Sequence, residues 1–177
     1  MNVIEQSQKS GRSRGETVSL HQKVNPVVAL ALHRKNDDEK MPKVLFVKYK
    51  DHDKMILPWD LVRTTEQPYK AVLRIGNTLF ELGLEHVRVR CYYSNFIDLP
   101  NAEGTALAVY YTLKLWQEEI ELIDKVLSDL DDSKIYGFEW VEVDEAELGD
   151  RFDQEITHSW KTLRKSVASN YGIKIRG

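Results

Sequence analysis

Residues whose side chains could bind a ligand gather between positions 59 and 81 of this 177-residue chain. Arg74 can form a bidentate pair with a carboxylate or can meet a phosphate. Trp59 can stack on a base, a contact worth roughly 1–3 kcal/mol, or can simply fill the rim of a pocket. We take Trp59, Asp60 and Arg74 as ligand-binding candidates, and Glu66 and Glu81 as the candidates for catalysis.

An amphipathic helix is expected to position these residues. It should begin near Thr65 or Glu66, because Thr65 can cap it and Pro68 suits its first turn, and it should end at Gly83. The apolar stripe that would face the core consists of Val72, Ile75, Leu79 and Leu82. The opposite face carries Lys70, Arg74, Asn77, Thr78 and Glu81. We therefore look for chemistry on that polar face, next to the loop that precedes the helix.

In this form the stretch resembles the box of the Nudix hydrolase family, which runs through a loop, a helix and a closing glycine with an apolar residue. Leu57-Pro58 opens the box, Glu66 lies six residues after Asp60, and Glu81-Leu82-Gly83-Leu84 closes it. The order of the other elements adds to the resemblance, which spans about residues 24 to 168. The family resemblance implies a mixed sheet between helices and a metal-dependent hydrolysis of nucleoside diphosphate-linked compounds.

The chain departs from the family's box at the positions that would do this chemistry. Trp59 and Asp60 stand where the family has two glycines, so the backbone freedom of that turn is lost. Counted forward from Arg74, the family's three helix glutamates are replaced by Ile75, Thr78 and Leu79. Counted back from Gly83, the same positions hold Asn77, Phe80 and Glu81. The two counts disagree, so this stretch is longer than the family's.

The missing glutamates weaken the case for a metal. Mg²⁺ prefers near-octahedral oxygen coordination and is usually held by one or two carboxylates plus substrate phosphate. Glu81, helped by Glu66, is a poor cage for the two or three ions that the resemblance implies. We expect Mg²⁺ as a cofactor only if the chain is active. It would then collect other ligands, from Asp60 and from Glu103 or Glu155.

Strands and helices alternate along the rest of the chain in a pattern typical of an α+β fold, a Nudix-like mixed sheet sandwiched between helices. The predicted strands are 27–32, central in the sheet, then 44–49, 55–57, 87–93, 105–116 and 135–143. Helical spacing recurs within 117–134 and again between Ile156 and Val167. The loop Asp51-His52-Asp53 has metal-like spacing, but we interpret it as a solvated tip between strands.

Composition predicts one domain over residues 21–177, preceded by a flexible polar arm at residues 1–20. The net charge of −3 argues against a strongly basic surface for nucleic acid. The chain has one cysteine, Cys91, and no apolar run long enough for a bilayer, so we expect a cytoplasmic protein without a membrane partner, although the basic start leaves an organelle open. The sequence contains no HExxH, P-loop, GxGxxG or GxSxG motif.

Three functional hypotheses follow. We favour a divergent Nudix-like protein that binds a nucleotide, an RNA or a protein partner without standard metal-dependent hydrolysis. The second hypothesis is an active pyrophosphohydrolase with rearranged metal ligands. The third is a structural subunit of a larger assembly, with the polar arm and the acidic segment Glu118 to Asp132 as contact surfaces.

Overall fold

The computed structural model describes residues 25–84, 88–98, 105–131 and 133–176. The arm expected at residues 1–20 lies outside the described residues, and so does the candidate metal ligand Glu103. In chain order the elements are β1 (Val27–Arg34), β2 (Lys43–Tyr49), β3 (Trp59–Leu61), α2 (Pro68–Phe80), β4 (Arg90–Asp98), β5 (Thr105–Lys114), α3 (Gln117–Ser128), β6 (Ile135–Glu142) and α4 (Gln154–Ser169).

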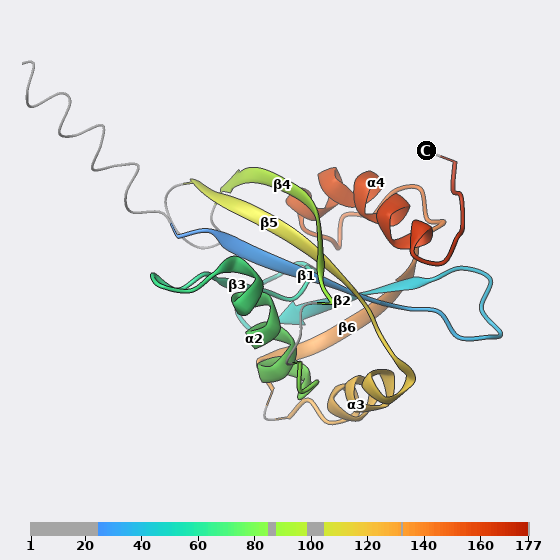
Figure 1. The fold of residues 1–177 in the computed structure, drawn as a ribbon, viewed down its shortest axis with the longest axis horizontal. Helices are drawn as coiled ribbons and strands as arrows, with labels where there is room; N and C mark the ends of the chain where they lie inside the picture. The colour runs from blue at the N-terminus through green and yellow to red at the C-terminus, as the bar shows by residue number, and fades with distance from the viewer. Residues whose placement is uncertain (1–24, 85–87, 99–104, 132, 177) are drawn as a thin grey trace, which may run out of the picture.

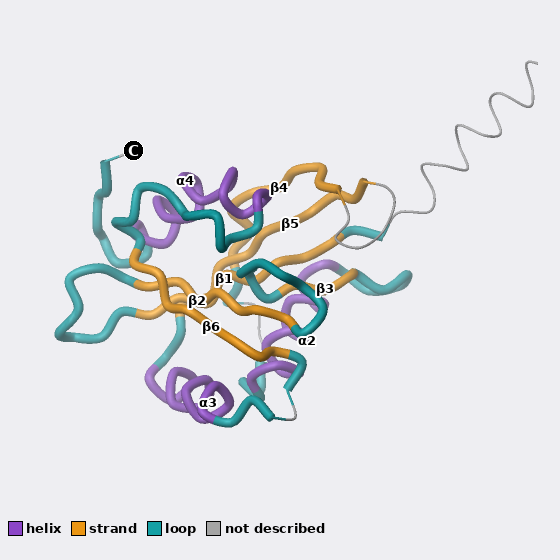
Figure 2. The backbone as a smooth tube through the Cα atoms, turned by 180° about the vertical axis from the view of Figure 1, so that it is seen from behind, coloured by secondary structure: helices purple, strands orange, loops and turns teal. Residues whose placement is uncertain are grey.

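The strands form one mixed sheet. Its main path runs β4-β5-β1-β2-β6, and β3 pairs with β1 beside this path. β1 is parallel to β5 but antiparallel to β2 and β3. Helix α4 covers one face of the sheet, and α2 and α3 cover the other (Figures 1 and 2). The predicted α+β sheet between helices is therefore confirmed. No helix in the described ranges combines the length and the apolar character needed to span a membrane.

β1 lies at the centre of the sheet and supplies both hydrophobic cores. Val28 and Leu32 point into the core beneath α2 and α3, whereas Ala29 and Ala31 point into the core beneath α4. A strand buried on both faces needs a continuous apolar run rather than an alternating one. This is why the run at 27–32 predicted a central strand, and the structure confirms it.

The short strand predicted at 55–57 is not formed as a ladder. Met55 and Ile56 make only isolated bridges, to Phe152 and Val47 respectively, because successive residues of this segment pair with different partners. The paired strand begins at Trp59 instead, as β3.

Helix α2 begins later than predicted. Its N-cap is Gln67, which makes no side-chain capping bond, and Pro68 opens the first turn. Thr65 and Glu66 remain in the preceding turn because the Glu66 backbone N–H donates to the Arg63 carbonyl at 3.0 Å and the Glu66 carboxylate accepts from the Arg63 N–H, also at 3.0 Å. Both the backbone N–H and the carboxylate of Glu66 are therefore bonded within the turn, and the helix begins after it.

The helix also ends before Gly83, at Phe80. Glu81 adopts a left-handed conformation with φ of 55°, which directs the chain away from the helix axis. The Asn77 side chain then holds the departing chain, because its amide donates to the Leu84 carbonyl at 3.1 Å and its oxygen accepts from the Leu84 N–H at 2.6 Å. Residues 81–83 therefore lie outside the helix.

Candidate ligand-binding site

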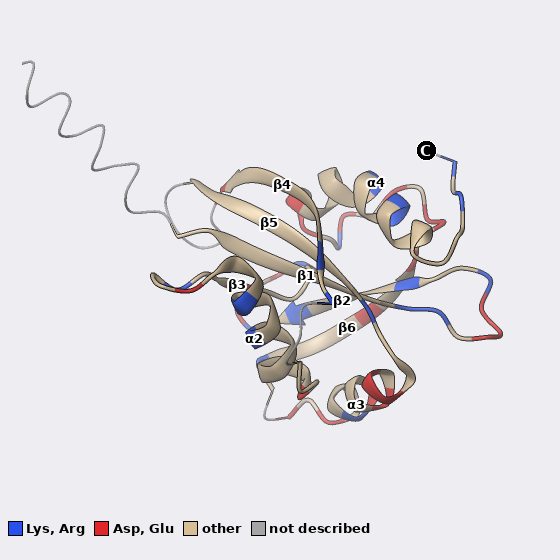
Figure 3. Cartoon of the chain, in the orientation of Figure 1, with Lys and Arg blue, Asp and Glu red and all other residues tan. Residues whose placement is uncertain are grey.

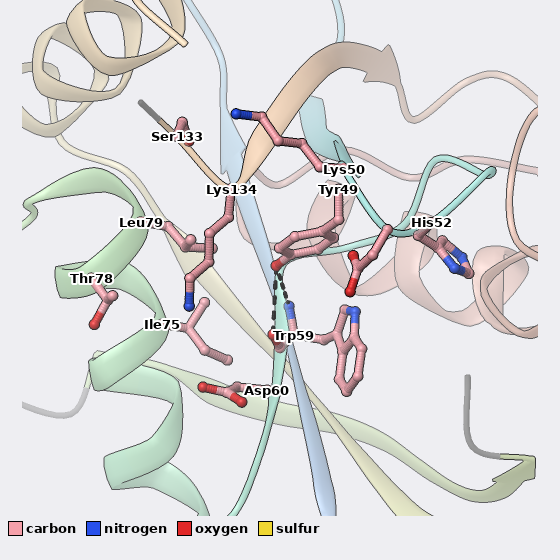
Figure 4. Close-up of a pocket in the computed structure, with 11 residues that line it drawn as sticks. Tyr49, Lys50, His52, Trp59, Asp60, Ile75, Thr78, Leu79, Ser133 and Lys134 are labelled. Atoms are coloured by element: carbon pink, nitrogen blue, oxygen red, sulfur yellow. Dashed lines mark hydrogen bonds between the residues drawn. The ribbon is translucent and has the colours of Figure 1, made fainter. Parts of the chain in front are cut away.

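A pocket of about 540 Å³ opens between β2, β3, α2 and the start of β6. We call it the Trp59 pocket; Figure 4 shows its walls. It is lined by Tyr49, Lys50, Asp51, His52, Trp59, Asp60, Ile75, Thr78, Leu79, Ser133 and Lys134. Of the residues predicted from sequence, Trp59 and Asp60 thus lie in the wall.

Tyr49 fixes the backbone of Trp59. The Trp59 N–H donates to the Tyr49 hydroxyl at 3.1 Å, and this hydroxyl donates to the Trp59 carbonyl at 3.5 Å. Burial raises the pKa of Tyr49, so the phenol stays protonated. β3 has only three residues, so the bonds to Tyr49 help to fix Trp59 at the pocket. Glycines at positions 59 and 60 would have given this turn more backbone freedom.

Arg74 is not among the residues that line the pocket; it joins the preceding loop to the helix. Its guanidinium donates to both Glu66 oxygens, from Nε at 3.0 Å and from Nη2 at 2.8 Å, to the Leu61 carbonyl at 2.9 Å, and to Asp60. A guanidinium has five N–H donors, so these four bonds occupy nearly all of them. The Arg74 hydrogen bonds hold the pKa of Glu66 at about 2. Arg74 and Glu66 therefore act as a brace for the loop.

The wall that α2 presents to the pocket carries no carboxylate. It consists of Ile75, Thr78 and Leu79, the positions reached by counting forward from Arg74. The set reached by counting back lies elsewhere: Asn77 bonds the Leu84 backbone, Phe80 is buried in the core, and Glu81 is exposed. The pocket thus faces Ile75 and Leu79 from the predicted apolar stripe, and of the predicted polar face only Thr78 lines it.

The residues present do not fit the metal that the resemblance implied. Glu66 precedes α2 and Glu81 follows it, so the 13-residue helix separates them by about 20 Å. Glu155, the other candidate ligand, lines a different cavity. Across the described parts of the chain, no three His, Cys, Asp or Glu side chains are grouped so that they could hold a metal ion.

Two lysines line the Trp59 pocket, but only one of them directs its charge into it. The Lys134 side chain points into the pocket beside Ile75, whereas the Lys50 ammonium group points away (Figure 4). Lys50 Nζ donates to the Asp131 carbonyl at 3.3 Å. Asp60 faces the pocket with a charge that Arg74 balances. Lys134 is therefore the cation best placed to meet an anionic ligand here.

A second cavity of about 330 Å³ lies on the α4 side of Trp59. Trp59 and His52 line both cavities, and the second one adds an apolar floor that includes Ala29 and Tyr110. The His52 ring lies against α4, with Nε2 3.3 Å from the Asp153 carboxylate. The two cavities adjoin along Trp59, so one elongated ligand could contact both.

Sequence reasoning missed Tyr49, His52 and Lys134. Tyr49 was predicted as the end of a strand, Lys134 as the end of the segment with helical spacing, and His52 was interpreted as part of a solvated loop tip. That interpretation is wrong for His52, whose side chain is only 17% exposed. The one usable signal was the charged loop at 50–54, which directly precedes the candidate site in the chain.

No protein-family model matches this chain, and no curated protein matches it. Solved structures do match. A mutT/nudix family protein from Listeria innocua is 13% identical with a TM-score of 0.56, covering 83% of this chain and 96% of that one. A MutT NUDIX hydrolase from Burkholderia pseudomallei is 19% identical with a TM-score of 0.54, covering 78% and 98%. Shewanella oneidensis NrtR, complexed with a 27mer DNA, is 17% identical with a TM-score of 0.57, covering 81% and 62%.

These likenesses are at the level of the fold. They extend over about four fifths of this chain. The resemblance inferred from the sequence is therefore confirmed as a shared architecture, and this chain has the Nudix fold.

Proposed function

We propose that this chain, which has the Nudix fold, binds a nucleotide-type ligand in the Trp59 pocket and does not perform standard metal-dependent hydrolysis. The observation that carries the proposal is the α2 wall of Ile75, Thr78 and Leu79. These side chains offer no charged oxygen to a divalent cation. The pocket nevertheless remains open.

The pocket residues suit a ligand with a phosphate and a flat ring. Lys134 supplies a flexible ammonium group for the phosphate. The indole of Trp59 supplies a stacking surface on the boundary of the two cavities. A nucleoside diphosphate compound is long enough to place its phosphates beside Lys134 and its base against the apolar floor of the second cavity, whose wall also carries Asp98, Asp153 and Glu155. We infer this class of ligand from the chemistry of the walls.

The NrtR match supports a binding role for this fold only in a general way. That protein was solved in complex with a 27mer DNA, and this chain covers 62% of it. The fold therefore also occurs in a protein that binds nucleic acid. Our proposal for this chain rests on its own pocket.

The test is thermal stability with a panel of nucleoside diphosphate compounds, each with and without Mg²⁺ or Mn²⁺, read beside phosphate release. A ligand at a hundred times its dissociation constant should add about 2.7 kcal/mol of stability. We expect stabilisation without metal and without turnover. Metal-dependent turnover would contradict the proposal and favour the hydrolase hypothesis, and no response to any compound would favour a structural subunit.

Two lysine variants make the test specific to this pocket. Lys134→Gln removes the ammonium group that points into the pocket, and Lys50→Gln removes one that points away from it. Both variants lose one positive charge, so long-range electrostatics change alike. Binding should weaken about tenfold in Lys134→Gln, the loss expected for one charge-assisted hydrogen bond, and should change little in Lys50→Gln. Equal losses would show that the ligand binds elsewhere.

A further inference from the structure

A basic cavity of about 570 Å³ lies at the opposite end of β1 from the Trp59 pocket. Its wall includes His33, Arg88, Arg90, Lys114 and Trp116, and we call it the basic cleft. Trp59 pairs with Ala29 on β1, and His33 lies four residues further along the same strand, roughly 13 Å away. The basic cleft is therefore a site separate from the one proposed above.

The charges of the basic cleft are only partly balanced. Arg88 pairs with Glu119 and donates to the Lys114 carbonyl at 3.2 Å. Arg90 and Lys114 have no carboxylate partner among the residues that the structure describes. In Figure 3 basic positions are visible at the start of β4 and at the end of β5. Two cations are thus left to attract an anion, although the chain as a whole is acidic.

His33 gives the basic cleft a buried polar atom without a partner. The residue is 1% exposed, and its Nδ1 lies 3.0 Å from the Tyr171 hydroxyl. Its Nε2 has no hydrogen-bond partner within the described ranges. Burial, with a smaller effect of Lys114, lowers the pKa of His33 to about 3, so the ring is neutral at neutral pH. An unsatisfied buried group costs free energy that a bound ligand would recover.

Trp116 adds an aromatic surface at the mouth of the basic cleft. Its side chain is among the exposed large hydrophobics, with 58% of the residue accessible. The Arg88 guanidinium lies over the indole, 3.6 Å from the ring centroid, and holds it in place. An exposed indole beside unbalanced cations is the combination that proteins use to bind nucleotide units, because every base has a face on which to stack.

We propose that the basic cleft binds the phosphate group of a nucleotide, with Arg90 and Lys114 on the phosphate, His33 Nε2 as a hydrogen-bond partner and Trp116 under the base. Nε2 donates to the phosphate in the tautomer in which the Tyr171 hydroxyl donates to Nδ1, 3.0 Å away, rather than to the His33 carbonyl at 3.4 Å. Either a free mononucleotide or a single strand of nucleic acid carries this chemistry. The proposal does not depend on what the Trp59 pocket binds.

Calorimetric titration of the full chain tests the proposal with three probes: inorganic phosphate, adenosine 5′-monophosphate and a short oligoadenylate. Adenosine monophosphate should bind about tenfold more tightly than phosphate, the gain expected from stacking on Trp116. Trp116→Ala should remove this gain and leave phosphate binding unchanged. A joint Arg90→Gln and Lys114→Gln variant should weaken all three probes about tenfold or more. Tighter binding of the oligoadenylate with a steep salt dependence identifies nucleic acid as the source, and equal binding identifies the free nucleotide.

The control is Lys161→Gln, which removes an exposed charge from α4 outside the basic cleft. It should bind all three probes like the wild type. Loss of binding in Lys161→Gln equal to that of the joint variant would overturn the proposal. Failure of all three probes to bind the wild type would also overturn it. The cations would then serve only to offset the negative end of α4 near Ser169 and Asn170.

Discussion

The Glu66 carboxylate accepts two parallel hydrogen bonds from Arg74, one from Nε at 3.0 Å and one from Nη2 at 2.8 Å. Glu66 lies in the loop before α2 and Arg74 lies within α2, so the pair ties the loop to the helix. The same guanidinium also reaches Asp60. In a chain that lacks the helix carboxylates, Arg74 therefore has a structural role. It fixes Glu66 and Asp60, the residue next to Trp59, to α2.

Glu66→Gln should lower the free energy of unfolding at pH 7 by about 1.5–3 kcal/mol, the usual effect of losing hydrogen bonds to a charged group. The Arg74 hydrogen bonds lower the pKa of Glu66 from 4.5 to about 2 in the folded state. Its contribution is therefore fully present above about pH 4.5 and is lost as the pH falls through about 2. Urea unfolding of the wild type and the variant across this range measures the difference.

The exposed Glu118→Gln on α3 is the control for the lost charge and should show no such pH-dependent difference. A gap between wild type and Glu66→Gln that stays constant from pH 5 to pH 2 would contradict the assignment of the ion pair.

His33 should make the protein less stable in mild acid. Its folded pKa of about 3 lies below the ordinary histidine value of 6.5, so between these two values the unfolded chain binds a proton that the folded chain does not. Stability should therefore fall as the pH drops below about 6.5, by up to about 1.4 kcal/mol per pH unit from this residue. Unfolding measured from pH 7 to pH 5 covers a window above the Glu66 transition.

His33→Gln keeps a polar side chain at this position and cannot titrate. Its stability should fall less steeply than that of the wild type over the same window. If the wild type and His33→Gln show the same slope between pH 7 and pH 5, another group is responsible.

Tyr49→Phe should lower stability by about 1–3 kcal/mol, because it removes one hydroxyl and leaves the Trp59 N–H without its acceptor at 3.1 Å. Thermal and urea unfolding measure this loss. Ligand affinity in the Trp59 pocket should weaken as well, since the position of Trp59 is no longer fixed. Tyr136→Phe removes a hydroxyl from a half-exposed ring and is the matched control. Equal stability of the two variants would contradict the role given to Tyr49.

Removal of metal ions should not change ligand binding in the Trp59 pocket. The α2 residues that line it, Ile75, Thr78 and Leu79, have no carboxylate to bind a divalent cation. Titration of the ligand with and without EDTA measures this. A joint Thr78→Glu and Leu79→Glu variant should create detectable Mn²⁺ binding, and the corresponding glutamine variant should not. An EDTA-sensitive wild type would refute the prediction.

Local patterns in the sequence were enough for the architecture. The apolar run at 27–32 predicted the central strand because such a run can be buried only with cover on both faces. The stripe that includes Val72 and Ile75 predicted α2, since a 3.6-residue period places these side chains on one side. The sequence alone also showed that Ile75, Thr78 and Leu79 replace the glutamates of the family's box helix when the positions are counted forward from Arg74. Helix ends were predicted less well, because the Asn77 contact with Leu84 stops α2 early.

The sequence by itself therefore determined the order of strands and helices and the residues that the box lacks. Only the tertiary structure decided which face of α2 lines the pocket, that Arg74 binds Glu66 and Asp60 together, and that Tyr49 and Lys134 come beside Trp59. The physical reason is the range of the interactions. Helical and strand periodicities act between residues a few positions apart, whereas the pocket forms where β2, β3 and β6 meet across the sheet, between residues up to about 85 positions apart in the chain.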